Sequence, residues 1–504
     1  MDDISVKRGR NSEQKKVEGS DFESAISATK FGWYNYGVIG IGCFWNLITV
    51  VEVTTFSFIL PTLQCDWALD TNRMGLLNSI IFLGMICGSV LWGFLADILG
   101  RRNLLSCCIL ALGFINIALG FSNNFAMLML FKFFSGFINS GPMSIIISYM
   151  SEMHGVRYRV RILVFIAIFY GGGNFATSLL GLIFLSRPLE VHFRGVTLHS
   201  WQLLLLTVAV LDFVGGTLAC LLPESPKFLM SRGRCEEALR VLQTIYRRNT
   251  GKHADTYPVS DSGVSMQKNG LMRAFTQIAP MLKPPYVTKC LLAFGIELFL
   301  LLGMNSMRLW MPQVFAFMGD GESDSDFDIC TKIQSNDVRR GNATDSDECS
   351  ASRVLSEGIF FNAMIVQSVG IVGTILICIF IKTIHNKLML VCSTLIGAIA
   401  SIAIYFSVSP LMVVIMYSLT VGLSLSSQAA FSSILSNIVP TAFRSTVISI
   451  SLSCGRLGSM LGTYLFPQLM AQGCWPPFVA IGVVFFACAM LCMCLPRSTR
   501  KTLL

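Results

Sequence analysis

Long blocks of apolar residues, each of roughly twenty residues, recur along the 504-residue chain, and short polar segments separate them. Each block can cross a bilayer as a helix, and the blocks are too continuous for the one-faced or alternating patterns of water-soluble cores. They predict an all-α membrane protein. The twelve expected transmembrane helices cover residues 37–60, 76–95, 104–121, 125–150, 162–185, 201–222, 287–310, 358–381, 388–406, 411–433, 446–470 and 475–495.

The composition excludes a water-soluble enzyme. Asp, Glu, Lys and Arg make up 13% of the chain, against about 25% in soluble proteins, and this leaves too few charges to cover a globule. Hydrophobic residues make up 53%, and the mean hydropathy is +0.64. The sequence has no GxxxxGK[ST] phosphate loop and no Cys/His cluster. We therefore expect no enzymatic activity, cofactor, metal or nucleic-acid partner, although the net charge is +9.

A polar linker, residues 223–286, separates the first six predicted helices from the last six. It begins with Pro223-Glu224-Ser225-Pro226-Lys227 and continues into the pattern of an amphipathic helix. The expected organisation is a disordered cytosolic segment 1–36, a six-helix bundle 37–222, the linker, a second bundle 287–495 with an extracytoplasmic loop 311–357, and a cytosolic tail 496–504.

The two bundles align with each other at one constant offset of 285 residues. This offset matches Glu152 with Asn437 and Arg159 with Arg444, and it also superposes the loop after the second span on the loop after the eighth. Agreement at two separate places indicates a duplicated six-helix unit. Transporters are commonly built in this way, with the substrate bound between the two repeats.

Basic residues indicate how the chain is oriented. Most of the 38 lysines and arginines fall in the amino terminus, the linker and alternate loops, which predicts that these segments and both termini are cytosolic. The sequon at Asn342 then lies in an external loop, where a glycan can be attached. An oxidising compartment would also permit a disulfide between Cys330 and Cys349 in that loop, with two free thiols as the alternative.

Two motifs resemble those of a known superfamily. The run Gly93-x-x-x-Asp97-x-x-Gly100-Arg101-Arg102, after the second span, resembles the signature of major facilitator superfamily transporters. The segment that begins at Pro223 resembles the one that follows span six in sugar and organic-ion porters. The resemblance implies two pseudo-symmetric six-helix bundles and an alternating-access transporter.

Narrower matches resemble one branch, which contains synaptic vesicle glycoprotein 2 and its related vesicle proteins. They are Glu52 followed by Pro61 and Cys65-Asp66-Trp67, and Pro440-Thr441-x-x-Arg444 followed by Arg456-Leu457-Gly458. A glycosylated loop with cysteines between spans seven and eight is also typical of that branch. The chain departs from it at Thr49, where the branch usually has an acid, and at Lys132, where it usually has Arg.

Charged residues near the ends of spans predict a cytosolic gate. Charge-assisted hydrogen bonds among such groups can hold one closed state and break in the other. The resemblance implies this role for Asp97, Gly100 and Arg101, while anchoring by positive charge is a sufficient explanation for Arg102. The candidate gate residues are Asp97, Gly100, Arg101, Arg102, Glu152, Arg159 and Arg444.

A few charges lie within the predicted spans, where each costs at least about 3 kcal/mol without a partner or a water-filled cavity. Arg456 is expected near the midplane, where it could hold a carboxylate, with Glu52 as its natural partner or as a proton carrier. Glu297 is a similar candidate, Lys132 could instead reach the outer surface, and Asp212 has weaker support. The candidate substrate or coupling residues are therefore Glu52, Lys132, Glu297 and Arg456, with purely structural ion pairs as the alternative.

These features favour a secondary active or facilitative transporter of a small organic solute, an ion rather than a neutral sugar, with proton coupling through Glu52 or Glu297. Two alternatives remain: a sugar porter, and a regulatory vesicle membrane protein that keeps the fold without transporting. We expect a multi-pass monomer, and the topology fits the plasma membrane and a secretory or synaptic-like vesicle equally well.

Overall fold

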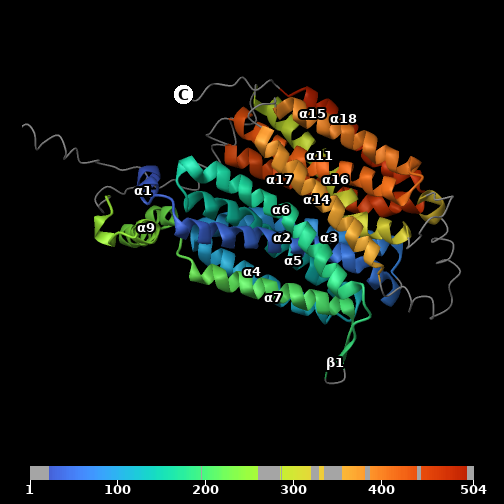
Figure 1. Cartoon of the computed structure of the whole chain (residues 1–504), viewed down its shortest axis with the longest axis horizontal. Helices are drawn as coiled ribbons and strands as arrows, with labels where there is room; N and C mark the ends of the chain where they lie inside the picture. Colours follow the sequence, from blue (N-terminus) through green and yellow to red (C-terminus); the bar gives the residue numbers. More distant parts are fainter. Residues whose placement is uncertain are drawn as a thin grey trace, which may run out of the picture.

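The structure is a computed structural model that describes residues 22–67, 69–193, 196–258, 284, 286–318, 329–333, 355–380, 386–439 and 444–495. Twelve long helices in this part of the chain form two six-helix halves (Figure 1). The amino-terminal half contains α2 (Trp33–Asp66), α3 (Thr71–Leu99), α4 (Arg101–Gly120), α5 (Phe125–Glu152), α6 (Val156–Leu185) and α7 (Ser200–Leu221). The carboxyl-terminal half contains α11 (Tyr286–Met318), α14 (Glu357–Phe380), α15 (Asn386–Ala403), α16 (Pro410–Ile438), α17 (Arg444–Ala471) and α18 (Trp475–Met493).

Eleven of these helices are long and apolar enough to cross a membrane. The exception is α17, which has the length but is too polar, since it carries Arg456 and several serines. Its position explains this composition, because α17 packs along α11 on one side and α3 on the other and needs less apolar surface toward lipid. The expected all-α fold with two six-helix halves is therefore confirmed.

Short polar side chains set the start of several helices. Asp70 accepts a hydrogen bond from the backbone N–H of Arg73 at the start of α3, and Asn124 does the same for Met127 at the start of α5. These caps satisfy backbone donors that the first helical turn leaves free. Several helices also extend beyond the predicted spans: the seventh, α11, continues to Met318 and contains Pro312.

The two halves meet along three helix pairs. Helix α3 packs on α17, α6 packs on α14, and α2 packs on α11. Figure 1 shows the amino-terminal half, coloured blue to green, lying along the yellow-to-red carboxyl-terminal half with the helices roughly parallel to one long axis. This arrangement places side chains of α2, α3 and α6 opposite those of α11, α14 and α17.

Small helices cap one end of the bundle, which we call the linker end. They are α1 (Phe22–Ala28), α8 (Pro226–Ser231), α9 (Cys235–Thr250) and η1 (Ala254–Thr256). Phe22 and Ile26 of α1 are buried against Phe228 and Leu242 of α8 and α9. The expected disorder of segment 1–36 is therefore wrong for its last part, because this apolar contact orders α1 and because α2 already begins at Trp33.

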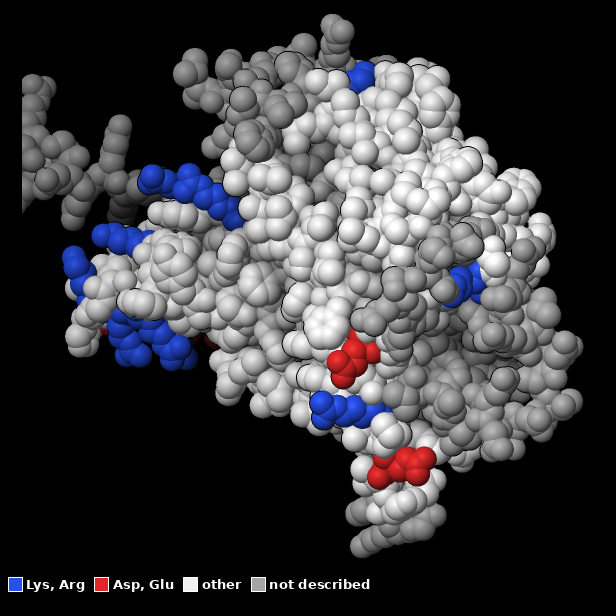
Figure 2. Space-filling view, turned by 45° about the vertical axis from the view of Figure 1, so that its right-hand side comes forward, with Lys and Arg blue, Asp and Glu red and all other residues white. Residues whose placement is uncertain are grey.

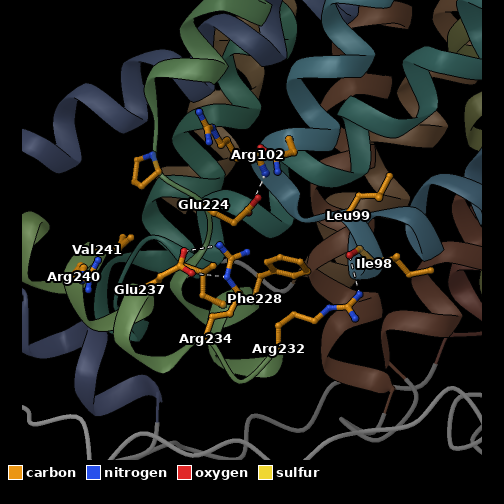
Figure 3. A pocket seen from close by; sticks show the side chains of 13 residues that line it. Ile98, Leu99, Arg102, Glu224, Phe228, Arg232, Arg234, Glu237, Arg240 and Val241 are labelled. Carbon is orange, nitrogen blue, oxygen red and sulfur yellow. Dashed lines mark hydrogen bonds and ion pairs between the residues drawn. The ribbon is translucent and has the colours of Figure 1, made fainter.

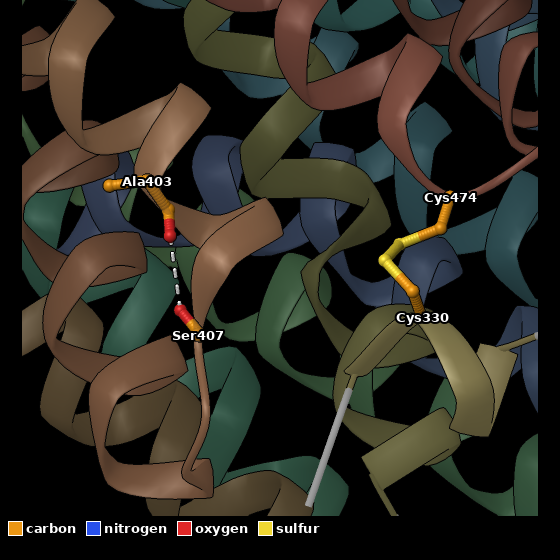
Figure 4. Close-up of a disulfide and its surroundings, with 4 residues drawn as sticks. All are labelled: Cys330, Ala403, Ser407 and Cys474. Carbon is orange, nitrogen blue, oxygen red and sulfur yellow. Dashed lines mark hydrogen bonds between the residues drawn. A yellow bond between two sulfur atoms is a disulfide. The ribbon is translucent and has the colours of Figure 1, made fainter.

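A short hairpin marks the opposite end of the bundle, which we call the hairpin end (Figure 1). Its strands β1 (Val191–Phe193) and β2 (Val196–Leu198) pair antiparallel, with Val191 opposite Leu198. A disulfide joins Cys330 to Cys474, which precedes α18 (Figure 4). The predicted Cys330–Cys349 pairing is therefore wrong, because the fold brings a cysteine 144 residues away to Cys330, and one sulfur forms one disulfide. Cys349 itself and Asn342 lie outside the described residues.

Candidate substrate pathway and linker-end network

A buried polar cluster surrounds Glu52 on α2. The hydroxyl of Ser135 on α5 donates to Glu52 Oε1 over 2.5 Å, and the amide Nδ2 of Asn116 on α4 donates to Glu52 Oε2 over 2.6 Å. The same Nδ2 donates to Oδ2 of Asp212 on α7 over 2.8 Å. One amide thus serves two carboxylates from two helices, and Oδ1 of Asp212 is buried without a hydrogen-bond partner among the described residues.

Lys132 on α5 belongs to this cluster. Its side chain is 2% exposed, so it does not reach the outer surface. The ammonium Nζ donates to the backbone carbonyl of Glu52 over 3.1 Å and lies 5.1 Å from the ring centroid of Phe56. The structure therefore brings two predicted site residues, Glu52 and Lys132, together, and it adds Asp212 as a second acid.

The other two predicted site residues lie in the carboxyl-terminal half. Glu297 on α11 is buried and accepts a hydrogen bond from Gln428 on α16 over 2.7 Å. Arg456 on α17 donates from Nη1 to the backbone carbonyl of Met85 on α3 over 3.2 Å. Arg456 thus contacts the opposite half, and its hydrogen bond goes to a carbonyl rather than to Glu52.

A further buried cation, Arg308 on α11, was not predicted. Its Nη1 donates to the hydroxyl of Tyr170 over 3.1 Å and to Oδ1 of Asn174 over 2.9 Å, both on α6 of the other half, and its Nη2 donates to Asn305 Oδ1 over 2.6 Å. The sequence signal was present, because Arg308 lies inside the predicted span 287–310. Its place near the end of that span made it look like a loop residue, whereas α11 continues for ten residues beyond it.

Further hydrogen bonds join the halves toward the hairpin end. Gln313 Nε2 donates to Gln64 Oε1 over 3.3 Å, and Gln468 Nε2 donates to Asn72 Oδ1 over 2.9 Å. The backbone N–H of Leu355 donates to the carbonyl of Leu185, the last residue of α6. Because these contacts all involve the helix ends at the hairpin end, the structure shows the two halves closed there.

Three of the predicted gate residues, Asp97, Arg101 and Glu152, form a network at the linker end. Arg101 at the start of α4 pairs with Asp97 of α3 over 3.0 Å and with Glu152 of α5 over 3.2 Å. Glu152 also accepts a hydrogen bond from the hydroxyl of Ser225 over 2.6 Å. The network therefore ties three helices of the amino-terminal half to the linker, and its described members all belong to that half and the linker.

Glu224 anchors the linker to the first turn of α4. Its Oε1 accepts hydrogen bonds from the backbone N–H groups of Arg101 over 2.9 Å and Arg102 over 3.1 Å. A carboxylate at this place satisfies free donors and complements the helix dipole. Gly100 makes the approach possible, since its φ is +98° and a Cβ there would lie 2.4 Å from Glu224 Oε2. Sequence analysis selected Gly100 and Arg101 but not this partner.

Figure 3 shows the cavity beside this anchor. It has a volume of about 630 Å³ and lies between the junction of α3 and α4 and the linker helices α8 and α9. Arg232 donates to the backbone carbonyls of Asp97 and Ile98, and Arg234 pairs with Glu237 over 2.6 Å. Because the Arg234–Glu237 pair is solvent-exposed, it contributes little to stability.

The remaining gate candidates have separate partners. Arg159 pairs with Glu23 of α1 over 3.0 Å rather than with the network around Arg101. The guanidinium of Arg102 donates to the carbonyl of Cys220 at the end of α7. Arg444 begins α17, and its side chain is outside the described part of the structure. Figure 2 shows lysines and arginines gathered at the end that carries α9, where Arg240, Arg247 and other bases are exposed.

Two six-helix halves that pack face to face are the fold of the membrane transporters of the major facilitator superfamily. A model of the family described as "Sugar (and other) transporter" matches residues 24–326. The chain belongs to this family.

Curated relatives point to one branch of it. Synaptic vesicle glycoprotein 2C of Rattus norvegicus is 29% identical over 223 residues, which cover 44% of this chain and 30% of that protein. Synaptic vesicle glycoprotein 2B of Homo sapiens is 27% identical over 254 residues, which cover 49% of this chain and 36% of that protein. The match therefore spans less than half the length of these relatives.

Solved structures share the fold at low sequence identity. The xylose transporter XylE from E. coli in a partially occluded inward-open conformation has a TM-score of 0.66 and 15% identity, and the match covers 92% of this chain and 99% of that chain. A crystal structure of a D-xylose-proton symporter has a TM-score of 0.67 and 14% identity, and the match covers 94% of this chain and 100% of that chain. At this identity the similarity concerns the fold alone.

Proposed function

We propose that the protein is a secondary transporter that moves a small organic solute by alternating access, with the solute bound between the two halves. The observation that carries this proposal is the pair of cations that cross between the halves: the buried Arg308 of α11 donates to Tyr170 and Asn174 of α6, and the half-buried Arg456 of α17 donates to the backbone of α3. Charges at this depth require partners or a hydrated pathway. Two rocking six-helix units provide such a pathway at their interface.

The linker end is the cytosolic side in this proposal. The exposed bases of α9 and its neighbours support it through the positive-inside rule. The contacts Gln64–Gln313 and Asn72–Gln468 then lie on the external side, so the described conformation is one with the external entrance closed. We accordingly propose that the network of Asp97, Arg101 and Glu152 stabilises the amino-terminal half against the linker while the halves rock.

Proton exchange at Glu52 is the proposed coupling step. Glu52 and Asp212 both accept a hydrogen bond from the Asn116 amide, so the two acids belong to one buried polar cluster. Movement of the halves would change the access of this cluster to water and allow proton exchange there. Glu297, with Gln428 as its partner, is the second candidate for the same role.

An organic ion is the proposed solute, ahead of a neutral sugar. Lys132, Arg308 and Arg456 are three cations on helices that line or adjoin the interface, and a cationic site favours an anionic or zwitterionic group. A sugar remains the second candidate, because the family includes sugar transporters. The monomeric state and a plasma-membrane or vesicle location are further proposals, the latter supported by the vesicle-glycoprotein relatives.

Ligand screening and uptake test the proposal. Purified full-length protein is heated with a panel of organic anions, organic cations and sugars, since a ligand that binds the folded state raises its melting temperature. The best compound is then taken up into liposomes with and without a proton gradient. We expect Glu52→Gln to abolish the response to the gradient and Arg456→Ala to slow uptake, while the exposed Arg247→Gln serves as the matched control. Stabilisation without any uptake would favour the non-transporting alternative.

A further inference from the structure

The guanidinium of Arg308 is buried between the two halves with only neutral partners. Its side chain is 3% exposed, and its three hydrogen bonds go to a phenol and two amides, those of Tyr170, Asn174 and Asn305. None of the ion pairs among the described residues includes Arg308. A buried charge without a counter-charge is strongly unfavourable. The fold therefore keeps a positive site whose balancing anion comes from elsewhere.

The hydrogen-bond count indicates what kind of anion fits. An arginine side chain has five N–H donors. The described contacts use both donors of Nη1 and one of Nη2, while Nε is buried with no partner in the described part of the chain. One N–H on Nε and one on Nη2 thus remain, which is the number that a bidentate carboxylate accepts.

The surroundings of Arg308 place this site on the proposed pathway. Tyr170 and Asn174 belong to α6 of the amino-terminal half, while Asn305 donates to Ser459 of α17 over 2.7 Å. Ser459 lies three residues after Arg456, so the two side chains share one face of α17. The site is therefore bounded by α6, α11 and α17. A second cation, Arg456, lies one helical turn from Ser459 along α17.

We propose that Arg308 is the residue that recognises the carboxylate of an organic anion, with Tyr170, Asn174 and Asn305 holding its guanidinium in position. This inference rests on the proposed function, because it places the solute between the halves. When the anion leaves, the same neutral groups keep Arg308 oriented and keep α6 tied to α11. The alternative is a purely structural tie between the halves, which requires no anion.

The test uses thermal shifts of purified full-length protein in chloride-free buffer. The probes are small mono- and dicarboxylates, each paired with its uncharged amide, together with methanesulfonate, phosphate and chloride. We expect at least one carboxylate, but not its amide, to stabilise the wild type. In Arg308→Gln the half-saturating concentration should rise at least about tenfold, the usual loss for a charged hydrogen bond. Arg247→Gln, which removes an exposed charge on α9, should leave it unchanged.

Several outcomes would overturn the proposal. They are the absence of stabilisation by every carboxylate, stabilisation by sulfonate, phosphate or chloride alone, and equal stabilisation of wild type and Arg308→Gln. If Arg308→Gln does not fold, Arg308→Lys takes its place, because it keeps the cation but loses the planar fork, and the same tenfold loss is expected.

Uptake measured in parallel separates this inference from the proposed function. Anion binding through Arg308 without flux contradicts transport and leaves the site intact. Flux of an uncharged solute without any anion-dependent stabilisation contradicts the site and leaves transport intact.

Discussion

Glu224 of the linker accepts a hydrogen bond from the backbone N–H of Arg101 over 2.9 Å, and thereby closes the first turn of α4 with a carboxylate from another segment. The contact joins the two motifs on which the family resemblance rests, the one that ends in Gly100-Arg101-Arg102 and the one that begins at Pro223. They lie more than a hundred residues apart in sequence. Their side-by-side position shows that the two motifs form one structural unit at the linker end.

Replacing Glu224 with Ala should release the linker from α4. The change removes the acceptor for two backbone donors and the favourable charge at the helix start, and such a loss typically costs about 1–2 kcal/mol. Hydrogen–deuterium exchange of α8 and of the first turn of α4 should become faster. Glu236→Ala is the control, because Glu236 is exposed on α9, and equal exchange in both variants would contradict the anchoring role.

Substitution of Gly100 by Ala should lower stability, because Gly100 is buried against Glu224 in a backbone conformation that favours glycine. A non-glycine residue at φ +98° and ψ 155° is strained by about 1–3 kcal/mol, and its Cβ would displace the carboxylate of Glu224. We expect a lower melting temperature for this variant. Gly93→Ala is the matched control, since nothing lies within 4 Å of a Cβ there; a similar loss in both variants would rule out the proposed clash.

Asn116→Leu tests the buried acid cluster. The substitution conserves approximate size but leaves Glu52 and Asp212 without their shared amide donor, and a buried carboxylate that loses a partner costs about 3 kcal/mol or more. Thermal unfolding should therefore occur at clearly lower temperature. Asn123→Leu, at an exposed position, should have a small effect. Unchanged stability in Asn116→Leu would show that the two acids do not depend on the amide.

The Cys330–Cys474 disulfide predicts a specific result in peptide mapping. Digestion without reductant should release one linked pair that contains these two cysteines, and Cys474→Ser should lower stability by about 2–4 kcal/mol. Cys392→Ser is the control, because that thiol is free and exposed. Recovery of a Cys330–Cys349 peptide instead would restore the pairing expected from sequence.

His154, which follows α5 outside the spans, predicts a dependence of stability on pH. Burial lowers the pKa of His154 below the ordinary value, although hydrogen bonding to Met150 opposes the shift. The unfolded chain therefore binds a proton at His154 more readily than the folded chain does. The contribution of neutral His154 to stability is complete above about pH 6.5, and it is lost as the pH falls from there toward the pKa of His154 in the folded protein. Acidification from about pH 7.5 to about pH 5.5 should destabilise the wild type more than His154→Gln, while the exposed His253→Gln should behave like wild type.

Hydropathy along the chain was sufficient to predict the fold class, the number of long helices and the division into two halves, because each depends on the length and spacing of apolar blocks. It also identified Glu52, Lys132, Glu297 and Arg456, since a charge within an apolar block is visible without any structure. The motifs were sufficient to select Gly100 and Arg101. The boundaries of α11 were harder to predict, and Arg308 was missed because apolar content alone did not show where that helix ends.

The contacts between distant groups could not be predicted in the same way. Groups that are separated by a hundred or more residues become partners through helix packing, which hydropathy does not encode. Glu224 accepts from the backbone of Arg101, Tyr170 contacts Arg308, and Cys474 rather than Cys349 bonds to Cys330. The same packing explains why α17 can be polar, since it lies between α3 and α11. The length of an apolar segment determines whether it can cross a membrane. The packing of helix faces against one another determines which group each buried charge contacts.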